Sequence, residues 1–196
     1  EFFSKTPMSS MGSDFADYNN DGYIDLFVGE MMPVGAKRQK MNLVPFSLEI
    51  YDELNSQGAP QYTRNMLQEN HGGKYYKDIG MMENVYATEW SWSSFFLDAN
   101  NDGFKDLFVS NGILRDMTNM DFVKDNVGEN YTDMGNPEVK SKMNPLRAPS
   151  TKTSNYIYQN VQGHFVDRST DWNLHHKEHV RGATYADLDR DGDLDL

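Results

Sequence analysis

Cysteine is absent from the 196 residues, so the chain has neither disulfide bridges nor a thiolate metal site. Long apolar runs are absent too, since no stretch approaches the ~20 apolar residues that a membrane-spanning helix needs. Basic residues are few: 18 Lys and Arg stand against 30 Asp and Glu, which gives a net charge of −12. This charge repels a phosphate backbone and argues against nucleic acid as a partner.

Proline and glycine are modest in number, whereas aromatic residues are plentiful. The chain has 7 Pro and 15 Gly against 11 Tyr, 11 Phe and 3 Trp, and 38% of its residues are hydrophobic. Such a chain is long and apolar enough to bury a core. Its composition favours strands and turns over a helical bundle.

The acidic residues gather in three windows that share the pattern Asp-x-Asp/Asn-x-Asp-Gly-x-x-Asp. We call residues 17–25, 98–106 and 187–195 loop 1, loop 2 and loop 3; their first residues are 81 and 89 positions apart. Short apolar runs beside these windows read as strands, and a second hairpin pattern repeats 90 residues apart, at 65–78 and 155–167.

Each repeat therefore offers about four antiparallel strands, the content of one blade of a β-propeller. We predict an all-β fold in which residues 1–196 form part of one propeller domain, with about two blades plus the start of another. A propeller needs typically 4–8 blades to close. The chain opens without an initiator Met and stops at Leu196, one residue after loop 3 and before the strand that should follow it, so we expect an incomplete propeller from a longer polypeptide.

Two insertions, at about 32–64 and 111–154, depart in composition from the strand segments. Residues 46–54 follow Pro45 and could form a short amphipathic helix, as could Met120–Val127. Asn-Pro and Ala-Pro steps in 128–150 favour an extended surface loop there.

The acidic loops have the ligands that calcium prefers, because Ca²⁺ takes about 6–8 oxygen atoms. Side chains at positions 1, 3, 5 and 9 of each loop can point inward, the residue at position 7 can offer its carbonyl, and the glycine at position 6 permits a sharp turn. The candidate ligands are Asp17, Asn19, Asp21, Tyr23 and Asp25 in loop 1, Asp98, Asn100, Asp102, Phe104 and Asp106 in loop 2, and Asp187, Asp189, Asp191, Asp193 and Asp195 in loop 3. We expect up to three structural calcium ions.

A solvated Asp/Asn/Gly turn would explain any one window, but it does not account for three copies in register. An EF-hand would need a bidentate Glu at position 12 and flanking helices; Val28 and Val109 hold that position here, within apolar runs. Loop 3 has four acidic side-chain ligands, one more than loops 1 and 2, so ligand charge predicts that it binds most tightly.

These residues resemble FG-GAP/VCBS repeats, the calcium-loop repeats also found in the propeller of integrin α-subunits. The segments Arg38–Met41, Arg64–Gln68, Glu89–Ser93 and Asn111–Asp116 further resemble the secreted bacterial branch related to cartilage acidic protein. The resemblance implies an exported, calcium-binding propeller of seven or a similar number of blades, with roles in adhesion or in binding protein or carbohydrate. It brings no catalytic residues. The chain is several times shorter than typical members.

Two other features have alternative explanations. Trp90 and Trp92 share one strand face, which suits packing between blades or a platform for stacking sugars. His175 and His179 could ligate a transition metal if their segment were helical, although a solvated loop explains them more simply.

The sequence contains no nucleophile elbow, phosphate-binding loop, dinucleotide fingerprint or zincin motif. We therefore expect a non-enzymatic, extracytoplasmic, calcium-stabilised propeller module for adhesion or binding, with a protein or glycan ligand, or neighbouring subunits of a surface complex, as its partner. The alternative is part of a carbohydrate-active propeller enzyme, a lyase or hydrolase, whose catalytic residues lie in the insertions or outside this chain.

Overall fold

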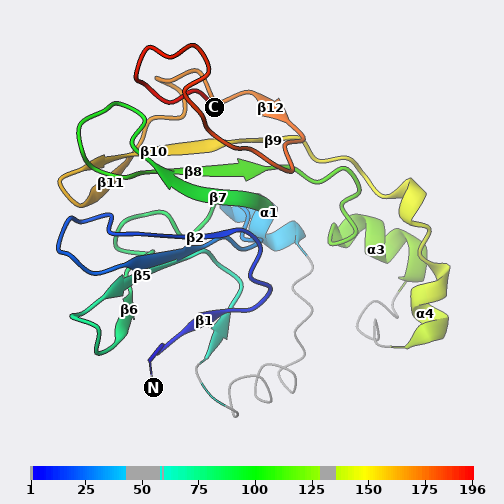
Figure 1. The fold of residues 1–196 in the computed structure, drawn as a ribbon. Coiled ribbons are helices and arrows are strands. Elements are labelled where there is room, and N and C mark those ends of the chain that lie inside the picture. The colour runs from blue at the N-terminus through cyan, green and yellow to red at the C-terminus, as the bar shows by residue number, and fades with distance from the viewer. Residues whose placement is uncertain (1, 43–57, 59, 129–135) are drawn as a thin grey trace.

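The computed structural model of the chain describes residues 2–42, 58, 60–128 and 136–196, and two four-stranded antiparallel sheets dominate it (Figure 1). The N-terminal sheet contains, in spatial order, β2 (Ser13–Ala16), β3 (Asp25–Val28), β5 (Met66–Asn70) and β6 (Tyr76–Asp78). The C-terminal sheet contains β7 (Ser91–Leu97), β8 (Asp106–Asn111), β10 (Tyr156–Val161) and β11 (His164–Asp167).

Both sheets are meanders, because their spatial strand order follows the chain order. Their registers match as well: Phe27 of β3 pairs with Leu67 of β5, and Phe108 of β8 pairs with Ile157 of β10. Loop 1 joins β2 to β3, and loop 2 joins β7 to β8. The predicted all-β character and the four antiparallel strands per repeat are confirmed, whereas closure into a propeller stays a prediction.

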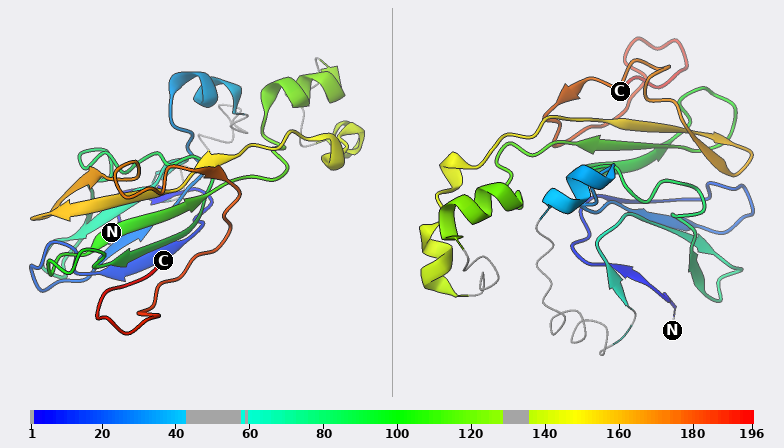
Figure 2. Two further views of the ribbon diagram at one scale, coloured as in Figure 1. Left: turned by 90° about the horizontal axis from the view of Figure 1, so that it is seen from above. Right: turned by 180° about the vertical axis from the view of Figure 1, so that it is seen from behind.

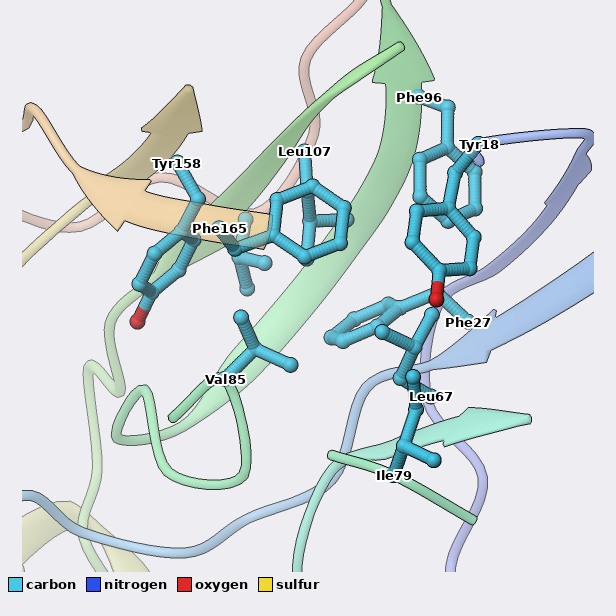
Figure 3. Packing of buried hydrophobic residues seen from close by; sticks show 10 residues of the cluster. Tyr18, Phe27, Leu67, Ile79, Val85, Phe96, Leu107, Tyr158 and Phe165 are labelled. Carbon is cyan, nitrogen blue, oxygen red and sulfur yellow. The ribbon is translucent and has the colours of Figure 1, made fainter. Parts of the chain in front are cut away.

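The largest core lies where the two sheets face each other (Figure 3). Phe27 and Leu67 enter it from the N-terminal sheet, and Phe96 and Leu107 enter it from the C-terminal sheet. The rings of Phe27 and Phe96 meet edge to face, with centroids 6.4 Å apart. Each such side chain contributes about 1.5–3 kcal/mol by leaving water, so this contact holds the sheets together.

The far face of the C-terminal sheet is covered by the chain that follows β11. Leu97, Phe108 and Ile157 are buried there, and the partly buried residues packed against them include Trp172, Leu174, Ala183 and Leu194. All six residues of β8 are consequently buried, because their side chains alternate between two covered faces.

The far face of the N-terminal sheet is more open. Phe15 on β2 and Phe96 on β7 occupy equivalent positions, each opposite a leucine, Leu26 and Leu107 respectively. Phe96 is only 3% exposed, whereas Phe15 is 60% exposed. The C-terminal sheet therefore packs on both faces, and the N-terminal sheet packs tightly on one.

The first insertion contains α1 (Ala36–Met41) and β4 (Gln61–Tyr62), which pairs in parallel with β1 (Thr6–Pro7). Helix α1 was not predicted from the sequence. The helix expected at 46–54 lies outside the described residues.

The second insertion contains the predicted helix, α3 (Met120–Val127), whose first turn is capped by the Asn119 side chain. The extended loop predicted for 128–150 is wrong in part, because α4 (Pro137–Lys142) and a 3₁₀ turn, η2 (Pro145–Arg147), lie within it. An Asn-Pro step begins both elements. The Asn side chain accepts hydrogen bonds from the free backbone amides at the helix start, and Pro fits the first helical turn. Val139 and Met143 then complete a small core with α3.

The helices and loops 1 and 2 occupy opposite ends of the sheets, with α3 and α4 on the right of Figure 1 and the two hairpin loops on the left. The left view of Figure 2 shows α1 and α3 together at the same end. A further two-stranded sheet lies beside β8, where β9 (Thr153–Ser154) pairs with β12 (Lys177–Glu178). None of the helices in the described ranges is long and apolar enough to cross a membrane.

Candidate cation-binding loops

Loop 1 folds around the side chains of its own acidic residues. Both carboxylate oxygens of Asp17 accept backbone hydrogen bonds, from Asp21 N at 3.0 Å and from Gly22 N at 2.8 Å. Asn19 Oδ1 also accepts from Asp21 N, at 3.1 Å, and Asp21 Oδ1 accepts from Tyr23 N at 2.8 Å. These bonds hold the side-chain oxygens of positions 1, 3 and 5 on the inner side of the turn. Each carboxylate keeps further lone pairs for a cation.

Loop 2 repeats this arrangement bond by bond. Asp98 accepts from Asp102 N at 3.0 Å and from Gly103 N at 2.9 Å. Asn100 Oδ1 accepts from Asp102 N at 3.2 Å, and Asp102 Oδ1 accepts from Phe104 N at 2.9 Å. Two sequences that differ at three of nine positions thus give one backbone trace, which the shared Asp, Asn and Gly positions determine.

Left-handed backbone at positions 4 and 6 produces the turn. Position 4 has φ of 58° at Asn20, 56° at Asn101 and 66° at Arg190, and position 6 has φ of 88° at Gly22, 88° at Gly103 and 97° at Gly192. Glycine adopts this conformation without steric cost, and asparagine tolerates it better than most residues. Arg190 carries more strain, so loop 3 is the least favourable backbone of the three.

Loop 3 concentrates the most negative charge. Asp187, Asp189 and Asp191 each bring one carboxylate oxygen within 4.8 Å of the others, and no other group of three acidic or imidazole side chains in the described part of the chain does so. A hydrogen bond between the side chains of Asp191 and Asp193 lowers the pKa of Asp191 and raises that of Asp193. Exposed carboxylates this close repel one another unless a cation or a proton neutralises them.

The carboxylates at position 9 of loops 1 and 2 are fully buried. Asp25 accepts from Tyr18 N at 3.3 Å and from Asn70 N, at the end of β5, at 2.7 Å. Asp106 accepts in the same way from Ala99 N at 3.0 Å and from Asn160 N at 2.7 Å. These groups tie each loop to the third strand of its own sheet.

Burial raises the pKa of both Asp25 and Asp106 to about 6. The backbone hydrogen bonds act in the opposite direction, and the other two Asp side chains of each loop add to the rise. Ionising these groups is therefore costly in the protein alone, and a divalent cation in the loop would offset that cost. Asp195 accepts from Leu188 N at 3.0 Å but is only partly buried.

The EF-hand alternative fails on the flanking structure. Val28 and Val109, at position 12 of loops 1 and 2, lie buried within β3 and β8. A strand enters and a strand leaves each of these loops, so the flanking helices that an EF-hand requires are absent.

The indoles of Trp90 and Trp92 do lie together, with ring centroids 6.5 Å apart, but both are only partly buried and neither belongs to a core cluster. The structure thus does not place this pair in a core cluster of the described residues, and both interpretations, packing between blades and a platform for sugars, stay predictions. Trp92 Nε1 donates to the Gly112 carbonyl at 2.6 Å. His175 is exposed and His179 bonds with Ser150 Oγ at 2.8 Å, which agrees with a surface loop.

A partly buried network of ion pairs, at the end of the sheets away from loops 1 and 2, was not predicted from the sequence. Arg38 on α1 donates to Glu89 at 3.3 Å and to Asp116 at 2.8 Å. Glu89 has φ of 76°, unusual for a residue other than glycine or asparagine, and its carboxylate also accepts from Val34 N at 3.2 Å. The sequence offered no spacing rule for this cluster, because its members come from both insertions and from the connection between the sheets.

Comparison with known proteins adds no name to this geometry. No known protein family, no curated protein and no solved structure matches the chain. The candidate site therefore rests on the loops themselves.

Proposed function

We propose that the chain is a calcium-stabilised repeat module of the FG-GAP type, in which each acidic loop binds one calcium ion. The observation that carries this proposal is the repetition of one set of hydrogen bonds in loops 1 and 2. Asp17 and Asp98 each accept a hydrogen bond from the backbone amide of the glycine at position 6, over 2.8 and 2.9 Å respectively. In both loops the side-chain oxygens at positions 1, 3 and 5 are arranged alike before any cation is considered.

The stacking of the sheets supports a propeller as the complete architecture. The N-terminal sheet packs on the C-terminal sheet through Phe27 and Phe96, and the residues after β11 pack on the next face through Phe108. Two successive interfaces thus use equivalent faces of the repeat. In a propeller every blade is packed on both sides, so the exposed face around Phe15 would receive a neighbouring blade.

Binding of a protein or glycan ligand is assigned to the insertions. Their helices α1, α3 and α4 lie at the end of the sheets away from loops 1 and 2, and their composition departs from that of the strands. Trp90 and Trp92 are partly exposed beside Gly112 of the second insertion. A rigid sheet scaffold with functional loops at one end is a common arrangement for recognition. The FG-GAP/VCBS proteins that the chain resembles are exported, so we propose a location outside the cytoplasm.

Calorimetric titration of the chain with Ca²⁺, followed by thermal unfolding with calcium and with a chelator, tests the proposal. We expect up to three binding events and a higher melting temperature with calcium. Asp21→Asn and Asp102→Asn should each weaken binding at one loop, whereas Asp171→Asn, an exposed carboxylate outside the loops, should not. Absence of calcium heat and of any thermal shift would overturn the proposal.

A further inference from the structure

Neighbouring loops are bonded directly to each other. The side-chain amide of Asn20 in loop 1 donates to the carbonyl of Gly103 in loop 2 at 3.2 Å. The side-chain amide of Asn101 in loop 2 donates to the carbonyl of Gly192 in loop 3 at 3.4 Å. In both cases position 4 of one loop reaches position 6 of the next. The contact is thus repeated along the chain and is not an accident of one turn.

Asn160, at the end of β10, connects loops 1 and 2 a second time. Its fully buried side-chain amide donates to the Tyr18 carbonyl of loop 1 at 2.7 Å and to the Lys105 carbonyl of loop 2 at 3.0 Å. Its backbone amide donates to the position-9 carboxylate of Asp106 at 2.7 Å. A single side chain is therefore bonded to both loops and adjoins the candidate ligand Asp106.

Asn70 is the equivalent residue of the first repeat and provides an internal comparison. Its backbone amide donates to Asp25 at 2.7 Å and its side chain donates to the Ile24 carbonyl at 3.0 Å, both within its own repeat. Its other side-chain partners, Tyr76 and Gly73, also belong to that repeat. No bond from Asn70 to a second loop occurs among the described residues.

We propose that Asn20 and Asn160 are positioning residues that couple loops 1 and 2, so that a cation bound in one loop tightens binding in the other. The inference rests on the proposed function for the cation. Tyr18 lies between ligand positions 1 and 3, and Gly103 lies between positions 5 and 7. A bond to either carbonyl limits the motion of the ligands beside it. Ordering one loop therefore reduces the conformational entropy that the second loses on binding.

The test uses the backbone amide signals of Gly22, Gly103 and Gly192 in NMR spectra during Ca²⁺ titration, because each reports one loop. Asp98→Asn should impair loop 2 and, through the coupling, weaken loop 1 by about fivefold or more. In a chain that already carries Asn20→Gly and Asn160→Ala, adding Asp98→Asn should change the calcium affinity of loop 1 by less than about twofold. Glycine at position 20 can keep the left-handed backbone that Asn20 adopts. Because Asn20 is exposed, Asn20→Gly should fold by itself, and it should already reduce the coupling if Asn160→Ala does not fold.

Asn70→Ala is the matched control: it should alter loop 1 affinity while leaving the effect of Asp98→Asn on loop 1 intact. If Asp98→Asn alters the calcium titration of the Gly103 signal alone and leaves that of Gly22 unchanged, the loops bind independently. That result would overturn the coupling and leave the proposed function standing. If no glycine signal titrates, the proposed function fails, and amide hydrogen exchange without cation decides the coupling. Asn20→Gly should then accelerate exchange in loop 2, and Asn101→Gly in loop 3; unchanged exchange in both would overturn it.

Discussion

Arg38 donates to the fully buried carboxylate of Asp116 over 2.8 Å, and this pair joins the first insertion to the second. Truncation by Arg38→Ala leaves Asp116 with its bonds from Thr118 and Thr151 but without a cation. Removing one partner of a buried ion pair typically costs about 3 kcal/mol. We expect that loss in urea unfolding. Lys37→Ala, on the exposed side of the same helix, should change stability by less than about 0.5 kcal/mol; equal effects of the two variants would contradict a structural role for the pair.

Glu89 should make stability depend on pH. Burial raises the pKa of its carboxyl group above the ordinary value of 4.5, although Arg38 and the Val34 amide act in the opposite direction. Because the folded state then holds the proton more tightly than the unfolded state, the contribution of Glu89 falls as the pH rises from about 4.5 through the folded pKa.

Glu89→Gln removes this titration, so the wild-type chain should lose stability relative to the variant as the pH rises through that window. Unfolding in urea at a series of pH values, without divalent cations, measures the difference. Asp25 and Asp106 are present in both proteins, and their titration cancels in the comparison. A difference that does not vary with pH, or that grows in favour of the wild type, would show that burial does not dominate at Glu89.

Loop 2 allows a test of ligand charge. Asn100 donates to Asp102 Oδ2 at 2.8 Å, so Asn100→Asp replaces an attraction by a repulsion when no cation is bound. We expect a lower melting temperature in chelator and tighter calcium binding, since the ligand set then matches the four acids of loop 3. Lys105→Gln makes the same change in net charge at an exposed position that is not a ligand, and it should tighten binding less. Weaker calcium binding by Asn100→Asp would contradict the proposed ligand role, and the same rule predicts that loop 3 binds most tightly.

Much of the scaffold could be predicted because it repeats. Phe27 and Phe108 stand beside equivalent loops in the sequence, and the structure places both in the second strand of a four-stranded sheet. Helix α3 was predictable as well, since Phe122, Val123 and Val127 form one apolar face and Asn119 caps it. A repeat pattern and a helical period are both local signals, and they sufficed here.

The missed features depend on contacts that have no local signal. Helix α4 begins at an Asn-Pro step that usually marks a turn, and it is held by packing of Val139 against the α3 core. The bond from Asn160 to the Tyr18 carbonyl spans 142 positions of the chain, and neither residue type suggests the other. Only the stacking of the two sheets brings them together.

Gly12 lies at a close approach between those sheets and provides a direct test of the stacking. A Cβ atom at this position would lie 2.2 Å from the Trp92 carbonyl oxygen and 2.7 Å from Ser94 N, both backbone atoms of β7. Gly12→Ala must therefore push β2 and β7 apart, and we expect a loss of about 1–3 kcal/mol or more in unfolding free energy. Gly182 has open space around its Cβ position, so Gly182→Ala should be neutral or stabilising by up to about 1 kcal/mol. If the two variants unfold at the same denaturant concentration, the sheets do not approach at Gly12 as described.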